Sequence, residues 1–207
     1  MTSIKEEVYK DIKRQIITCQ YMPGDVIDEK ELIQKYGVSR TPIREALNQL
    51  TDENLVTIVP RRGTFVAPIS VKDVRDLYDY IEILEPYVVQ HAGKYIPREE
   101  LEHYLQIFSD EASMSQTEYT EYDQEFHNLL ITYCDNYYMA KTYANLQEHI
   151  QRVRMLTNAG ERIVASRQGH MEIIEAMLAG DLEKMYLAAQ KHAGESRKQA
   201  ASFAFSR

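Results

Sequence analysis

Hydrophobic positions near the N-terminus recur at helical spacing. An apolar residue stands at every fourth position of the first segment, which predicts one amphipathic helix. These positions are Ile4, Val8, Ile12 and Ile16. A turn with proline and glycine at residues 22–25 precedes a second helix, which Asp28 and Glu31 open with the spacing of a capping box. Gly37 stands where a left-handed C-terminal cap is needed, so this second helix is predicted to be short.

A third helix begins at Thr41-Pro42, because proline is tolerated in the first turn of a helix. Its apolar and polar positions separate onto two arcs. The first arc holds Ile43, Ala46, Leu47 and Leu50, and the second holds Arg40, Thr41, Arg44 and Asn48. A short helix, a glycine turn and a second helix with a polar face predict a helix-turn-helix. Strand patterns at 55–59 and 64–66 flank the turn Pro60-Arg61-Arg62-Gly63, which predicts a basic wing.

From residue 70 onward the pattern is helical and gives no strand signal. Glycine, proline and asparagine breaks divide it into six predicted helices. These helices cover about 71–93, 97–113, 117–134, 137–158, 161–179 and 181–203. The sequence therefore predicts a mainly α protein. A winged helix-turn-helix DNA-binding domain would occupy residues 1–69, and an all-α helical bundle would occupy residues 70–207.

Charge is distributed unevenly between these two parts. The net charge is −8, yet residues 1–69 hold 10 basic and 10 acidic residues, so residues 70–207 carry the whole excess. An acidic second part repels phosphate, and any DNA contact is expected from the first part. No apolar run approaches the roughly 18 residues of a membrane span, and the charged start is unlike a secretory signal. With two distant cysteines, Cys19 and Cys134, we expect reduced thiols, a cytoplasmic location and no membrane contact.

Side chains suited to DNA gather at the start of the third helix and on the wing. Arginine can bond two acceptors of guanine in the major groove, and Arg40 and Arg44 lie one turn apart on the polar face. Hydroxyls at a helix start suit phosphate, and a basic hairpin with a glycine suits the backbone or minor groove. The candidates are Ser39, Arg40, Thr41, Arg44, Arg61, Arg62 and Gly63. A solvated helix face explains two arginines alone, but not their combination with the turn and the wing.

Four residues of the second part have the spacing of a metal site. Asp123 and His127 lie one turn apart on one predicted helix. His170 and His192 stand ten and twelve residues from Gly180 on either side of a predicted turn, hence at similar depth. Three nitrogens and one oxygen suit zinc or a similar divalent ion, with positions left open for a ligand. By spacing alone, an ordinary hydrogen bond between Asp123 and His127 remains the alternative.

The first part resembles the DNA-binding domain of GntR-family regulators. The resemblance rests on Val38-Ser39-Arg40-Thr41-Pro42-Ile43-Arg44-Glu45-Ala46-Leu47, and on Arg62-Gly63-Thr64-Phe65-Val66 of the wing. It implies that the residues matching Lys30, Arg40 and Arg44 contact operator DNA and that Gly63 enters the groove. Lys30 could equally be an exposed lysine of the second helix.

The second part is similar to the FCD-type effector domain of GntR regulators, many of which bind a metal. The motifs fall in that family's order: Asp73 with Leu77-Tyr78, Leu84-Glu85-Pro86, Asp123 with His127, His170, Ala179-Gly180-Asp181 and His192. The resemblance implies a bundle-centre ion held by Asp123, His127, His170 and His192, most often zinc, with nickel or another transition metal as alternatives. It also implies that a small organic acid completes the coordination and that the helical domains form a homodimer.

One departure from that family concerns the recognition of a carboxylate. The family often has an arginine at about the place of Ile81, and its absence weakens the expectation of a carboxylate clamp there. Arg152 and Arg154 on a later helix are candidates to replace it, or are simply solvated.

The sequence thus predicts a ligand-responsive DNA-binding transcriptional regulator, with a repressor favoured over an activator. The first alternative is an enzyme, but a di-iron bundle requires Glu-x-x-His on two helices and only Glu100 with His103 is found. The sequence also contains no HExxH, GxSxG or phosphate loop. The second alternative, a structural DNA-binding protein, would need no site in the bundle interior. The pattern identifies neither the effector nor the operator.

Overall fold

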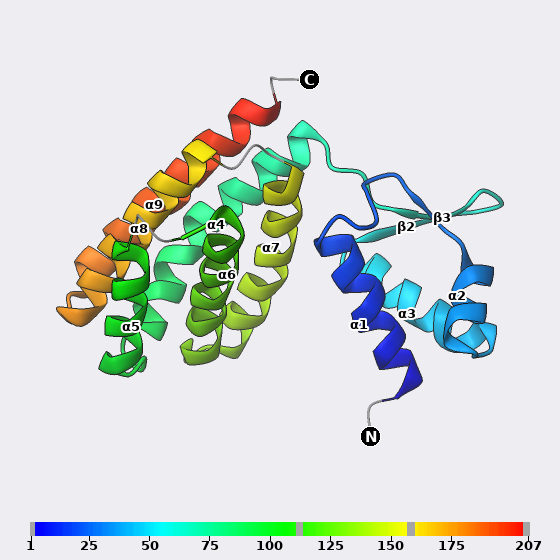
Figure 1. Cartoon of the computed structure of the whole chain (residues 1–207), viewed down its shortest axis with the longest axis horizontal. Helices are drawn as coiled ribbons and strands as arrows, with labels where there is room; N and C mark the ends of the chain where they lie inside the picture. The colour runs from blue at the N-terminus through cyan, green and yellow to red at the C-terminus, as the bar shows by residue number, and fades with distance from the viewer. Residues whose placement is uncertain (1–2, 111–113, 157–159, 205–207) are drawn as a thin grey trace. The chain divides into compact units, whose positions relative to one another are not determined.

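The computed structural model describes residues 3–110, 114–156 and 160–204, and the side chains of all of these except 160–162 and 201–204 (Figure 1). The chain divides into two compact units, Met1–Ser70 and Val71–Arg207. We call them the head and the helical unit.

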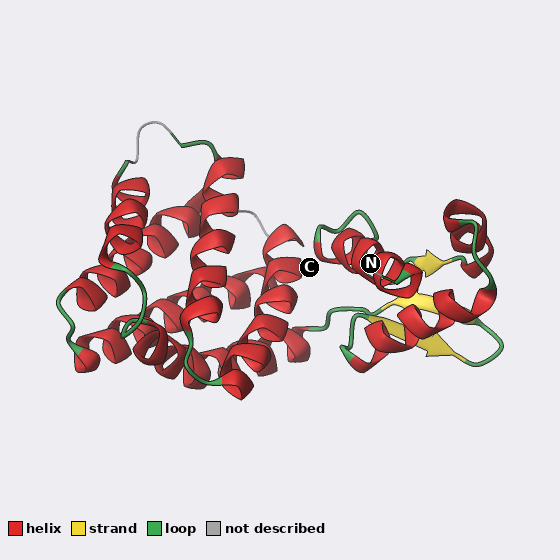
Figure 2. Cartoon of the chain, turned by 90° about the horizontal axis from the view of Figure 1, so that it is seen from below, coloured by secondary structure: helices red, strands yellow, loops and turns green. Residues whose placement is uncertain are grey.

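The head combines three helices with a small antiparallel sheet (Figure 2). Its elements are α1 (Ile4–Ile17), β1 (Val26–Ile27), α2 (Glu29–Tyr36), α3 (Arg40–Asp52), β2 (Val56–Val59) and β3 (Gly63–Val66). The strand order is β1-β3-β2, and β2 and β3 pair from Val56 opposite Val66 to Val59 opposite Gly63. The helix-turn-helix and the wing were predicted. Strand β1 was not, because two residues give no periodic signal.

The apolar arcs of the head helices form one core. All four positions predicted for the apolar face of α3 are buried, and they pack with apolar side chains of α1 and with Leu32 of α2. On α1, Val8, Ile12 and Ile16 are buried, whereas Ile4 is 42% exposed in the first turn. Burial at these shared positions fixes α3 against α1 and turns its polar face outward.

The ends of α2 follow the predicted signals in part. Asp28 caps the N-terminus as predicted. Its side chain accepts a hydrogen bond from the backbone N–H of Lys30 at 2.7 Å, and not from the backbone N–H of Glu31 as a capping box requires. At the other end, Gly37 has φ 63°, in the left-handed region that glycine adopts without strain. The helix is therefore short, and the chain turns at once into α3.

Among the described residues the second unit is entirely helical. Its helices are α4 (Val71–Ala92), α5 (Arg98–Ser109), α6 (Gln116–Tyr133), α7 (Tyr137–Leu156), α8 (Gly160–Leu178) and α9 (Leu182–Ala204). All six predicted helices are present. The predicted ends at 113 and 158 lie outside the described residues, and α5 ends at Ser109.

Helix α4 runs through the middle of this unit (Figure 1) and packs against α9, α7 and α6. Helix α8 packs against α9 and α5, and it approaches α6 more loosely. Helices α6, α8 and α9 therefore meet around one interior region, to which α4 and α7 also contribute. No described helix has the length and apolar character required to span a membrane.

Candidate metal centre and DNA interface

Three histidines from three helices meet in the interior of the helical unit. His127 comes from α6, His170 from α8 and His192 from α9, and all three are buried. One ligand atom of each lies within 4.8 Å of those of the other two. The rings of His170 and His192 are closest, with centroids 4.5 Å apart. Such a group could hold a metal ion.

Asp123 joins this cluster from one turn earlier on α6. Its Oδ2 lies 3.9 Å from Nε2 of His127, and its Oδ1 lies 3.8 Å from Nε2 of His170. The structure therefore brings together all four residues that the sequence singled out. Their predicted role as ligands remains a prediction.

Hydrogen bonds orient the ring of His127. The hydroxyl of Tyr143 donates to Oε2 of Glu85 at 2.9 Å, and its oxygen lies 2.8 Å from Nδ1 of His127. Because a phenol has one proton to donate, this pattern assigns the imidazole proton to Nδ1. The lone pair of His127 is then on Nε2, which has no hydrogen-bond partner among the described residues.

The ring of His170 is oriented in the same way. Tyr119 donates from its hydroxyl to Oδ1 of Asp123 at 3.4 Å, and its oxygen lies 3.5 Å from Nδ1 of His170. Nε2 of His170 is also buried without a hydrogen-bond partner in the described part of the chain. Buried polar atoms are nearly always partnered, and metal-ligating histidines usually have the other nitrogen held by a second group. Both histidines thus fit a divalent metal ion.

His192 approaches the cluster from α9. Its Nε2 lies 3.9 Å from Oε1 of Glu85, a buried oxygen with no hydrogen-bond partner among the described atoms. The ring faces Gly169 of α8, where the absence of a side chain leaves space for it. Glu85 therefore approaches His192 with one oxygen and reaches His127 through Tyr143 with the other.

Burial and charge together set the protonation of the cluster. Burial lowers the pKa of His127 and of His170 to about 3, so both rings are neutral at physiological pH, as metal ligation requires. Burial alone would raise the pKa of Asp123, but Arg154 and the neighbouring histidines hold it well below its ordinary value. Burial raises the pKa of Glu85 to about 7.

Arg154 of α7 is the cationic partner of Asp123. Its Nη1 forms an ion pair with Oδ2 of Asp123, and the arginine side chain is only 11% exposed. Arg152 is buried outright, so the alternative in which both arginines are simply solvated is wrong. The position where the related family often has an arginine is filled by Ile81, which is 1% exposed. The guanidinium next to the cluster thus comes from α7 and not from α4.

The predicted DNA-reading residues all lie at the surface of the head. The eight exposed residues are Lys30, Ser39, Arg40, Thr41, Arg44, Arg61, Arg62 and Gly63. Ser39 is the N-cap of α3, and its hydroxyl makes no capping hydrogen bond. Gly63 has φ 125° at the start of β3, and Arg61 has φ 64° at the wing tip. Both are left-handed, which lets the three-residue turn close tightly.

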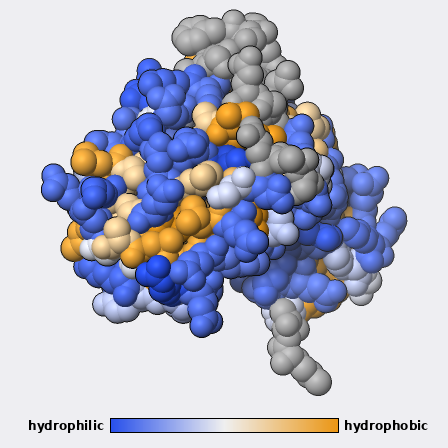
Figure 3. Space-filling model, turned by 60° about the vertical axis from the view of Figure 1, so that its left-hand side comes forward, coloured by the Kyte–Doolittle hydropathy of each residue, from blue (hydrophilic) through white to orange (hydrophobic). Residues whose placement is uncertain are grey.

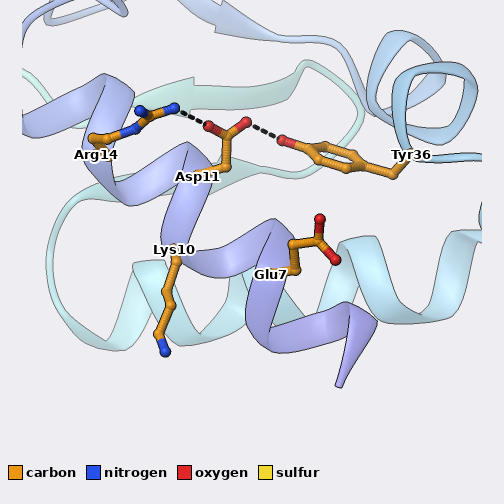
Figure 4. Close-up of a pocket in the computed structure, with 5 residues that line it drawn as sticks. All are labelled: Glu7, Lys10, Asp11, Arg14 and Tyr36. Carbon is orange, nitrogen blue, oxygen red and sulfur yellow. Dashed lines mark hydrogen bonds and ion pairs between the residues drawn. The ribbon is translucent and has the colours of Figure 1, made fainter. Parts of the chain in front are cut away.

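A polar network joins α1 to the end of α2, and part of it is drawn in Figure 4. The carboxylate of Asp11 accepts hydrogen bonds from Arg14 at 2.6 Å, from Lys35 at 2.7 Å and from Tyr36. Burial acts to raise the pKa of Asp11, but these donors outweigh it and keep the pKa well below its ordinary value. The network sets the position of α2 relative to α1.

Sequence reasoning missed Tyr119 and Tyr143, and it named Arg154 without connecting it to Asp123. Tyr119 stands four residues before Asp123 on the same helix face, so its position could have been found by periodicity. Tyr143 and Arg154 share one face of α7, eleven residues apart. Their contacts with Glu85 and Asp123 join different helices, and no spacing along one helix reports such contacts.

Two family models match nearly consecutive parts of the chain. The model described as "Bacterial regulatory proteins, gntR family" matches residues 4–66, and the model described as "FCD domain" matches residues 76–195. The first covers the head and the second covers the helical unit with all four cluster residues.

Curated relatives are similar over most of their length. The chain is 28% identical over 200 residues to the HTH-type transcriptional repressor RspR of Escherichia coli strain K12, covering 93% of this chain and 86% of that protein. It is 31% identical over 160 residues to the Nta operon transcriptional regulator of Aminobacter aminovorans, covering 76% of this chain and 75% of that protein.

Solved structures support the same fold. A GntR transcriptional regulator from Rhodococcus sp. RHA1 matches with a TM-score of 0.78 and 19% identity, over 96% of this chain and 97% of that one. The E. coli protein McbR/YncC matches with a TM-score of 0.78 and 18% identity, over 99% of this chain and 98% of that one. At such identities the likeness concerns the fold alone.

Proposed function

This chain belongs to the GntR family of bacterial regulatory proteins and carries an FCD domain, and from that premise we propose that it is a metal-dependent repressor. It is a DNA-binding transcriptional regulator and not an enzyme. Operator binding is assigned to residues 1–69, and effector binding to residues 70–207. The observation that carries the proposal is the buried cluster of His127, His170 and His192 beside Asp123.

The cluster would hold a divalent metal ion. Asp123, His127, His170 and His192 supply one oxygen and three nitrogens, a donor set that suits zinc, with nickel or another transition metal as alternatives. A bound ion would supply open coordination positions for an anionic ligand. Glu85, through Tyr143, orients His127 and so favours the ring position in which Nε2 faces the cluster.

The effector would be a small organic acid. Arg154 is largely buried beside Asp123, where its guanidinium can bind a carboxylate that enters the cluster. This assigns to α7 the role that the related family often gives to an arginine at the place of Ile81. A site buried in the interior of the bundle favours a small anion over a polymer or a lipid.

The head would bind operator DNA through the start of α3 and through the wing. Arg40 and Arg44 lie one turn apart on the exposed face and suit base edges, while the wing suits the backbone or minor groove. The proposed contacts are Lys30, Ser39, Arg40, Thr41, Arg44, Arg61, Arg62 and Gly63. Two relatives are named repressors, RspR and GlaR of E. coli, which favours repression in this chain too.

We further propose a cytoplasmic homodimer joined through the helical unit. Helix-turn-helix proteins commonly bind as dimers to half-sites one DNA turn apart. The face seen in Figure 3 carries an apolar patch among hydrophilic side chains. Exposed apolar residues of this unit include Ile83 and Tyr87 on α4 and Leu187 on α9, which a partner subunit could cover.

The test combines metal analysis with DNA binding. Full-length protein without a histidine tag is purified, its metal content is measured, and duplexes that it selects from a randomised library are titrated. A panel of two- to six-carbon mono-, di- and tricarboxylates is added at fixed zinc. The proposal expects about one metal ion per chain and weaker DNA binding with at least one acid. Identical titrations across the panel, or protein free of metal after growth and reconstitution with zinc, would overturn it.

A further inference from the structure

Glu29 lies between the two arginines that start the third helix. It is the first residue of α2, and its Oε2 lies 3.2 Å from Nε of Arg44 and 4.0 Å from Nε of Arg40. Both arginines are more than half exposed, whereas Glu29 is 26% exposed. One carboxylate of the first helix of the helix-turn-helix thus contacts both arginines of the second.

The contact to Arg44 uses one edge of the guanidinium. Nε donates to Glu29, so neither terminal nitrogen is needed to hold the pair. Guanidinium donors form a planar fork, and fixing Nε fixes the plane in which the terminal nitrogens point. A bidentate bond to O6 and N7 of guanine needs that fork in one defined orientation. An arginine held in advance loses less side-chain freedom when it binds a base.

The same carboxylate reduces attraction to phosphate. A negative charge beside Arg40 and Arg44 offsets part of the positive potential that the two arginines offer to any duplex. Attraction to phosphate does not depend on sequence, whereas a bidentate bond to a base does. Glu29 therefore weakens the attraction of the head to every duplex. It also favours the arginine orientation that forms bidentate hydrogen bonds only with the correct bases.

We propose that Glu29 is a specificity-determining residue that orients Arg44, and more weakly Arg40, toward base edges and withholds them from phosphates. The inference rests on the proposed reading of DNA by the head, and goes beyond it by assigning a role to an acidic residue. Glu29 is a positioning residue here, because it acts through the arginines and need not touch DNA itself.

A structural role for Glu29 in stabilising α2 can be separated from its role in orienting Arg44. A carboxylate in the first turn of α2 also interacts favourably with the helix dipole. Glu31 stands in the same first turn, is exposed, and offers the same change of charge when replaced. Glu31→Gln is therefore the matched control for Glu29→Gln, and melting temperatures of both variants report any loss of folding.

The experiment uses the full-length chain and two duplexes. Wild-type protein selects sequences from a randomised duplex library, and the most enriched duplex is compared with a scrambled duplex of equal length and composition. The ratio of the two dissociation constants measures discrimination. Glu29→Gln is expected to lower this ratio about tenfold, within the range for one lost base contact, with scrambled-duplex binding unchanged or tighter. Glu31→Gln is expected to leave the ratio within about twofold of wild type, as for a residue without a base-reading partner.

A double variant identifies the route of the effect. In an Arg44→Ala background, Glu29→Gln should cause little further loss of discrimination, since the side chain it orients is gone. Equal ratios for Glu29→Gln and Glu31→Gln would overturn the inference. If Arg44→Ala lowers the ratio in that same series, the proposed DNA reading still stands.

Failure of the proposed DNA reading would give a different result from failure of the role of Glu29 alone. If no sequence is enriched, or if Arg40→Ala and Arg44→Ala both keep wild-type discrimination, the assignment of DNA reading to α3 is wrong. The role of Glu29 would then be wrong with it. A loss of discrimination by Glu29→Gln that persists in full in the Arg44→Ala background would also overturn the orienting role.

Discussion

Gly169 of α8 lies directly against the imidazole of His192 on α9: a β-carbon at this glycine would stand 2.5 Å from Nδ1 of the ring. Atoms do not approach so closely, so Gly169→Ala must displace the ring or separate the helices. We expect the variant to keep all four proposed ligands and yet bind zinc about 10–100-fold more weakly, as when a supporting group of a ligand is altered. Zinc titration against a competing chelator measures the change.

A matched control for this variant exists on α9. A β-carbon at Gly194 would meet Oε1 of Glu82 at 3.7 Å, which is ordinary van der Waals contact. Gly194→Ala should leave zinc affinity unchanged, and replacing a helical glycine by alanine typically adds up to about 1 kcal/mol of stability. Equal zinc affinity of the two variants would show that Gly169 does not position His192 for the metal.

Removal of a proposed ligand should have a larger effect. His170→Ala takes one nitrogen from the buried cluster, and we expect the metal content of tag-free protein to fall from about one ion per chain to well below half. His103, exposed on α5, offers the control His103→Ala, which should retain the wild-type content. Elemental analysis of both proteins decides the matter. Equal content in both would end the assignment of His170 as a ligand.

Arg154 should contribute most to the stability of the protein when no metal is present. Arg154→Ala leaves the buried charge of Asp123 without its ion-pair partner, and breaking a buried pair in this way costs about 3–5 kcal/mol. A divalent ion restores positive charge beside Asp123, so zinc should recover much of the loss. Thermal unfolding with zinc and with a chelator measures both effects. A deficit that is the same in the two conditions would contradict a shared site.

The Asp11 network predicts how the head responds to acid. The pKa of Asp11 is lowered by folding, so its stabilisation is complete above the unfolded pKa of about 4 and is lost as the pH falls below it. Asp11→Asn should speed hydrogen exchange of α1 about 10–30-fold at pH 7, matching roughly 1.5–2 kcal/mol, because hydrogen bonds to a charged group are lost. At pH 3 this difference should shrink.

Asp52→Asn is the control for that measurement. Asp52 is exposed at the end of α3 and offers the same change of charge within the head. Its replacement should leave exchange of α1 unchanged at both values of pH. If the effect of Asp11→Asn were independent of pH, the charge of Asp11 would not be the source of the stability.

Operator binding should depend on the start of α3. Arg40→Ala is expected to cost about 1–3 kcal/mol in binding a selected duplex, as for an arginine that contacts a base, with less effect on a scrambled duplex. Arg75→Ala on α4, outside the head, provides a control of equal charge change. Titrations at one fixed salt concentration compare the two, and unchanged binding by Arg40→Ala would remove it from the interface.

Most of the fold could be predicted because it depends on local periodicity. The buried face of α3 and the glycine cap of α2 follow from patterns within about four residues. His170 and His192 could be placed at similar depth because one short turn joins their helices. The contacts of Arg154 with Asp123 and of Glu29 with Arg44 depend on how separate helices cross. Helix packing angles scatter by about 15–20°, and sequence spacing does not determine them.

The uneven division of charge is expected to affect how this regulator finds its sites. The head has no net charge, and the helical unit carries the whole excess of −8. Long residence on random duplex requires many lysine and arginine contacts with phosphate, and here an acidic body and the Glu29 carboxylate both oppose it. We therefore expect the protein to search for its sites mainly by brief collisions from solution, with little sliding along DNA. We also expect it to dissociate quickly from a wrong sequence.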